Sequence, residues 1–122
     1  MENFFITITG INYYLGKTPF KPNRIVKLVK DTENDFDSEA IKVSQPFIGT
    51  VGYVANSIET VCDGTCSAGR IYDKIEDTAY AKVMFITNSF VIAELLSKTE
   101  VEEMLNDMSP VDRKLAETHK IC

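Results

Sequence analysis

The sequence has no long hydrophobic run and no basic, apolar leader. No apolar stretch approaches the roughly 20 residues that a helix needs to cross a bilayer, so a membrane-spanning protein is excluded. Met1 to Phe4 contain no basic side chain, and the segment that follows alternates Thr with Ile, unlike a secretory signal. We therefore expect the protein in the cytoplasm.

Cysteine and histidine are also scarce. Three cysteines, an odd number without an export signal, favour reduced thiols over a disulfide framework. Cys62-x3-Cys66 and His119-x2-Cys122 supply four possible zinc ligands, but their spacing is loose and the second pair is terminal, so free thiols are preferred. Because His119 is the only histidine and no Ser or Cys has an evident base, we expect no enzyme activity and no cofactor.

A surplus of cations is missing as well. The net charge of -5 argues against indiscriminate nucleic-acid binding, which depends on Lys and Arg that neutralise phosphates. The charges are segregated, so a site here would have a basic and an acidic end, although solvated loops and strand edges would show the same pattern. The cations are Lys17, Lys21, Arg24, Lys27 and Lys30, and they precede the alternating acids Asp31, Glu33, Asp35, Asp37 and Glu39.

What the chain does contain is a series of short strand-like segments. They alternate apolar and polar residues or are rich in Ile and Val, which predicts a mainly β (α+β) meander or small barrel. No internal repeat or linker divides the 122 residues, so we expect a single domain over 1–122, with the barrel at about 4–95 and helices at about 99–120. The predicted strands are Phe4–Thr9, Arg24–Lys30, Ala40–Ser44, Thr50–Val54, Tyr80–Thr87 and Phe90–Leu95.

The helical signals are weaker. Asn56 or Ser57 can cap a short helix that ends at Gly64, and residues 67–76 read either as a helical turn or as an irregular loop. A capping box at Thr99–Glu102 and the proline of Ser109-Pro110 predict helices near 101–108 and 110–120. This acidic tail is a poor contact for nucleic acid and a fair contact for a homo-oligomer.

Two segments have the features of an exposed binding site. The acidic loop of residues 31–39 leads into the strand that begins at Ala40, and a Pro46/Gly49 turn connects that strand to the next one. Loops held against a hairpin in this way often recognise a ligand. Adjacent Tyr13 and Tyr14 point to opposite faces of an extended chain. An exposed tyrosine beside cations is a platform for stacking bases, although a tyrosine that packs over a loop is an equal alternative.

These segments together resemble a known family. Asn12-Tyr13-Tyr14-x-Gly16, then Asn34-Asp35-Phe36-Asp37-Ser38-Glu39-Ala40-Ile41-Lys42-Val43, then Val51-Gly52-Tyr53 resemble the HIRAN domain. That domain occurs alone in bacteria and as an N-terminal module of fork-remodelling helicases. The resemblance covers about Phe5 to Thr87 and implies an OB-like β-barrel with small helices. In the helicase members it also implies a pocket for the 3′-hydroxyl end of single-stranded DNA.

By this resemblance, Tyr13 and Phe36 would stack on the terminal base and Asp37 would accept a hydrogen bond from the 3′-hydroxyl. At the positions of Asn12, Phe36 and Tyr53, the helicase members have Arg, Tyr and His. This chain therefore has fewer cationic and polar groups with which to bind DNA. Neighbouring cations would have to offset the acids. The nucleic-acid-binding residues expected are Asn12, Tyr13, Tyr14, Phe36, Asp37, Tyr53, Lys17, Lys27 and Arg70.

Other readings of the same residues stay open. The chain could be a protein-interaction or oligomerisation module that has lost the DNA site, with Phe36 an aromatic plug and Asp37 a loop cap. A metal-dependent nuclease would need a second acid beside Glu39 and Lys42. An EF-hand calcium loop is disfavoured because Phe36 stands where that pattern requires glycine.

Overall fold

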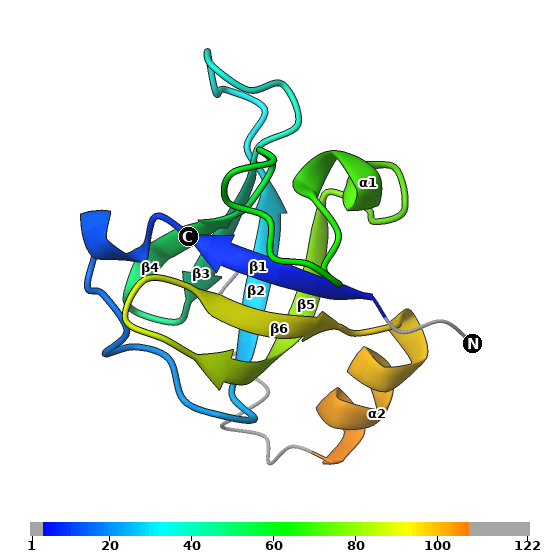
Figure 1. Ribbon diagram of the computed structural model, residues 1–122. Helices are drawn as coiled ribbons and strands as arrows, with labels where there is room; N and C mark the ends of the chain where they lie inside the picture. Colours follow the sequence, from blue (N-terminus) through cyan, green and yellow to red (C-terminus); the bar gives the residue numbers. More distant parts are fainter. Residues whose placement is uncertain (1–3, 108–122) are drawn as a thin grey trace.

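The protein is a closed six-stranded antiparallel barrel with short helices outside it (Figure 1). The computed structural model describes residues 4–107. The strands follow one another around the barrel in the order β1-β4-β3-β2-β5-β6, and β6 pairs with β1 to close it. The elements are β1 (Phe5–Thr9), η1 (Ile11–Tyr13), β2 (Ile25–Lys30), β3 (Ile41–Gln45), β4 (Gly49–Val54), α1 (Ala68–Tyr72), β5 (Thr78–Ile86), β6 (Val91–Leu95) and α2 (Lys98–Asp107).

The predicted mainly β, OB-like barrel is confirmed, and so are its six strands. Period-2 alternation sends Ile6 and Ile8 of β1 into the same core as Val26 and Leu28 of β2, and all four are fully buried. Burying one such aliphatic side chain contributes about 1.5 to 3 kcal/mol. These buried side chains stabilise the barrel, which thereby serves as a rigid support for its loops.

A close approach between β1 and β4 explains the glycine at position 52. A Cβ atom built there would lie 3.0 Å from both Ile8 Cγ2 and the Thr9 carbonyl oxygen. Only a residue without a side chain lets the two strands meet at this point, where Thr9 pairs with Tyr53. Gly52 thereby positions Tyr53 beside the segment that follows β1.

The short helix predicted from Asn56 or Ser57 is wrong. Residues 57–66 instead form hydrogen-bonded turns, and the helix begins later, at Ala68. The hydroxyl of Thr7 accepts a hydrogen bond from the Cys62 backbone N–H at 3.1 Å and bonds the Thr65 hydroxyl at 2.8 Å. These contacts with β1 replace intrahelical bonds, so tertiary structure overrides the local helix signal. The ambiguous segment 67–76 is helical only over α1.

The first predicted tail helix corresponds to α2, whereas the one near 110–120 lies outside the described residues. An exposed ion pair between Lys98 and Glu76 joins α2 to the segment after α1. Such surface pairs contribute little, so α2 is weakly attached by this contact. Within residues 4–107, no helix has the length and apolar character required to span a membrane.

Candidate nucleic-acid interface

The loop between β2 and β3 projects from one end of the barrel (Figure 1). Its base is closed by the Asp31 N–H, which donates to the Ala40 carbonyl at 2.8 Å. Inside it, the Asn34 side-chain oxygen accepts from the N–H groups of Phe36 and Asp37, each at 2.9 Å, in an Asx-turn arrangement. The Phe36 side chain is 100% exposed. The loop is thus built of hydrogen-bonded turns that present a phenyl ring to solvent, and the interpretation of Phe36 as a plug is wrong.

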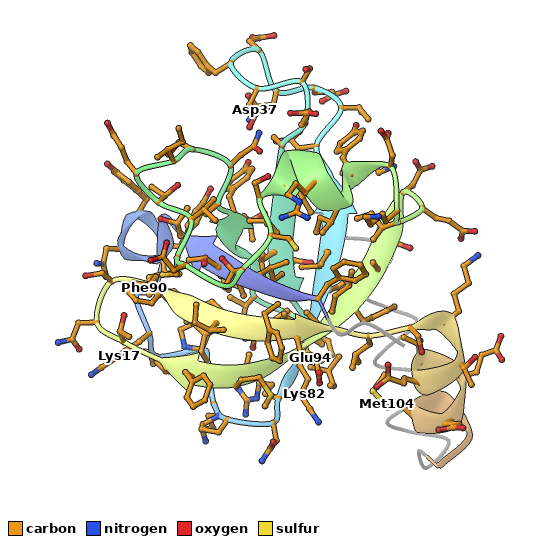
Figure 2. The ribbon with its side chains drawn as sticks, turned by 45° about the vertical axis from the view of Figure 1, so that its right-hand side comes forward. Lys17, Asp37, Lys82, Phe90, Glu94 and Met104 are labelled. Atoms are coloured by element: carbon orange, nitrogen blue, oxygen red, sulfur yellow. The ribbon has the colours of Figure 1, made fainter. Side chains whose placement is uncertain are left out.

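Asp37 connects this loop to the segment that follows β4. Its Oδ1 accepts from the Glu39 N–H at 2.9 Å, and the Asn56 amide nitrogen donates to Oδ1 at 3.2 Å and to Oδ2 at 3.0 Å. Figure 2 shows Asp37 on the projecting loop. Its carboxylate is therefore held by two partners and is partly buried, in the residue that follows the exposed Phe36.

The two adjacent tyrosines have different environments. Tyr13, in η1, is 91% exposed, whereas Tyr14 lies near the Tyr53 hydroxyl. That hydroxyl donates to Asp31 Oδ2 at 3.0 Å. Burial, followed by the hydrogen bond to Asp31, raises the pKa of Tyr53 well above its usual range. The Tyr53–Asp31 bond ties β4 to the start of the acidic loop, and Tyr13 is left as the free ring.

The predicted cations are not brought together. Lys27 is only 2% exposed, and it pairs in register with Ser44 of β3 and Tyr80 of β5. The expectation that Lys27 binds nucleic acid is therefore wrong. The missing information was which side chains of the neighbouring strands cover Lys27, which the order of residues does not reveal.

Asn12 and Lys17 hold a turn instead of facing Asp37. The Asn12 amide donates to the Asn88 carbonyl at 3.2 Å, and Lys17 Nζ donates to the Asn88 side-chain oxygen at 2.7 Å. Figure 2 shows Lys17 near the turn between β5 and β6 and well apart from Asp37. Arg70 is different, because it is exposed on α1 and lines a shallow cavity together with Asn56. Of the expected cations, Arg70 is the one that shares a cavity lining with Asn56, the side chain that bonds Asp37.

The residues that the structure describes offer little support for a bound metal ion. Cys62 and Cys66 are free, partly exposed thiols, while His119 and Cys122 lie outside the described residues. Among the residues that the structure describes, no three His, Cys, Asp or Glu side chains are grouped so that they could hold a metal ion. Neither the calcium loop nor the nuclease gains a site from these residues.

A sequence model of the HIRAN domain matches residues 1–85. The chain belongs to the HIRAN domain family. No curated protein matches it. Among solved structures, the crystal structure of the HIRAN domain of human HLTF is similar, with a TM-score of 0.56 and 19% identity over 85% of this chain and 84% of that chain. At this identity the likeness shows a shared fold.

Membership in the family supports DNA binding, because HIRAN domains are nucleic-acid-binding modules. HIRAN domains are also generally non-catalytic.

One residue of the candidate interface was not identified from the sequence. Asn56 looked like a helix cap, yet its amide bonds Asp37, 19 residues earlier in the chain. No local pattern could have indicated this pair, since it forms only when β4 is placed next to the loop.

Proposed function

We propose that this HIRAN domain is a non-catalytic module that binds single-stranded DNA at its free 3′-hydroxyl end, in replication or repair. The observation that carries the proposal is the Asp37 carboxylate, which Asn56 and the Glu39 N–H hold in place in the residue that follows the exposed Phe36.

A carboxylate at this position distinguishes an end from the interior of a strand. Inside a strand, each 3′ oxygen is esterified to a phosphate, so Asp37 would meet a negative charge and no donor. At a free end it meets a hydroxyl, which can donate to it in a charge-assisted hydrogen bond. The same group thus attracts the terminus and repels other sites, which is specificity obtained partly by repulsion.

Aromatic rings and one cation can supply the remaining affinity. The exposed rings of Tyr13 and Phe36 are available to stack bases, at about 1 to 3 kcal/mol per base. Arg70, which lines the shallow cavity together with Asn56, would supply positive charge on the α1 side of Asn56.

The test compares two labelled oligonucleotides that differ only in ending with a 3′-hydroxyl or a 3′-phosphate. The 3′-hydroxyl form should bind more tightly, and Asp37→Asn should reduce this preference more than it lowers the overall affinity. Asp35→Asn is the matched control, since it removes the same charge from an exposed position of the same loop. Equal binding of the two oligonucleotides by the unmodified protein would overturn the proposal.

The second candidate is a protein-interaction module that has lost the DNA site. It is favoured by the charge around Asp37, where Glu33 and Asp35 are exposed while Lys27 is buried. A titration with single-stranded DNA at low and moderate salt separates the two functions. Binding that weakens steeply with salt is expected for DNA. A folded protein that binds neither oligonucleotide at low salt would support the interaction module.

A further inference from the structure

Asn56, immediately beyond β4, connects the acidic loop to helix α1. Its side-chain oxygen accepts from the Gly69 backbone N–H at 2.8 Å, and its amide nitrogen donates to both carboxylate oxygens of Asp37. A backbone N–H can only donate, and a carboxylate can only accept. The amide therefore has one orientation that satisfies both partners, and α1 sets it.

The helix approaches closely enough for this contact because position 69 is glycine. A Cβ atom there would lie 2.7 Å from Glu39 Oε1 and 3.2 Å from Asn56 Oδ1. A side chain at position 69 would crowd the Asn56 amide, whereas the exposed Glu39 side chain could move aside. The loop, Asn56 and the first turn of α1 thus form one packed unit.

Building on the proposed recognition of a 3′ end, we infer that Asn56 is a positioning residue that determines the specificity of Asp37. A carboxylate offers about four lone-pair directions. Asp37 uses Oδ1 for Glu39 N–H and for Asn56, and Oδ2 for Asn56 alone. Asn56 therefore stops the carboxylate from rotating and leaves Oδ2 with a lone pair for one further donor, the terminal hydroxyl.

The readout is the preference ratio, meaning the Kd for the 3′-phosphate oligonucleotide divided by the Kd for the 3′-hydroxyl oligonucleotide. Asn56→Ala removes the amide and should lower the ratio by roughly tenfold, the size of a hydrogen bond to a charged group. Ile58→Ala is the matched control, because Ile58 is almost fully exposed in the same segment and should leave the ratio unchanged.

A second variant protects the test against loss of folding. Asn56→Asp has the same shape and still accepts from Gly69, but it replaces the donor with a carboxylate that repels Asp37. It should stay folded but melt at a lower temperature than the unmodified protein, because two like charges then face each other, and it should lose the preference. Melting curves recorded with each Kd separate this effect from a general loss of structure.

The outcomes distinguish this inference from the proposed function. An unmodified protein without any preference would overturn the function itself. If the unmodified protein prefers the 3′-hydroxyl and Asp37→Asn abolishes the preference, yet a folded Asn56 variant retains it, the inference is wrong. Unfolding of both Asn56 variants would also overturn it, since Asn56 would then be required by the fold and not by recognition.

Discussion

At the scale of single residues, Tyr13 and Phe36 place large rings in solvent, where the core gains nothing from them. Replacing either with Leu should therefore leave the melting temperature nearly unchanged while it weakens single-strand binding by about 1 to 3 kcal/mol. Fluorescence anisotropy with a labelled oligonucleotide measures the affinity, and thermal unfolding measures the stability.

Phe47 provides the matched control for this experiment. It is also largely exposed, but it lies in the turn between β3 and β4, at the opposite end of β3 from the acidic loop. Phe47→Leu should leave DNA binding intact. If the Tyr13 and Phe36 variants bind as the unmodified protein does, stacking by these rings is excluded.

Tyr53 gives a prediction about pH. Its pKa is raised by burial and by the bond to Asp31. Above about pH 10 an unfolded tyrosine loses its proton while folded Tyr53 keeps it, so the unfolded state binds fewer protons and stability falls as pH rises. Tyr53→Phe should cost about 1 kcal/mol at neutral pH through the lost hydrogen bond. It should also make the alkaline decline in melting temperature less steep.

The measurement is thermal unfolding between neutral and alkaline pH, with absorbance titration of the phenols alongside. The titration of Tyr53→Phe should show one late-titrating phenol fewer than the unmodified protein, with Tyr80 remaining because burial also raises its pKa. A variant that loses stability above pH 10 as steeply as the unmodified protein would contradict the assignment of this linkage to Tyr53.

At the scale of elements, the acidic loop depends on Asn34, whose side chain accepts from two backbone N–H groups. Asn34→Ala should speed amide hydrogen exchange at Phe36 and Asp37, because both N–H groups lose their acceptor. DNA affinity should fall as well, since binding must then order the loop. Asp35→Ala, in the same loop, should leave the exchange of these two amides unchanged. Equal protection in the Asn34 variant would show that other contacts hold the loop.

The strands could be predicted from sequence because their pattern is local. Alternation at Ile6 and Ile8, and at Val26 and Leu28, marks the apolar side of each strand, which packs into the core. Barrel closure could not be predicted in this way. β1 pairs with both β4 and β6, and those pairings depend on segments far apart in the chain.

Residue type alone did not decide which aromatic side chains are exposed. The sequence left Phe36 as either a stacking ring or a plug and did not say which of Tyr13 and Tyr14 is exposed, and the structure exposes Phe36 and Tyr13 almost fully. Lys27 and Asn56 were misjudged because their surroundings come from other strands. A lysine in a sequence shows no sign of the neighbours that bury it, and an asparagine after a strand gives the same signal whether it caps a helix or bonds a distant aspartate.

At the scale of the whole molecule, the family match and the structural unit have different ends. The HIRAN match ends at residue 85, and the resemblance seen in sequence ends near Thr87. The barrel continues through β6, which pairs with β1 and β5. A cut after Thr87 would therefore remove the strand that closes the barrel. We expect that fragment to be unfolded.

A cut after Ser97 should have the opposite result. It keeps the Leu96 N–H bonded to the Tyr80 carbonyl at 2.9 Å and removes α2 together with the chain that follows. The loss of Val101 uncovers a groove that Phe4 and Tyr80 also line, so the melting temperature should fall modestly. The removed segment holds more acids than cations, so its loss should maintain or strengthen DNA binding at low salt.

Circular dichroism on residues 1–97 tests the folding, and the anisotropy titration tests the DNA binding. The fragment cut after Thr87 provides the contrast. A folded 1–97 fragment that no longer binds DNA would show that the tail takes part in recognition.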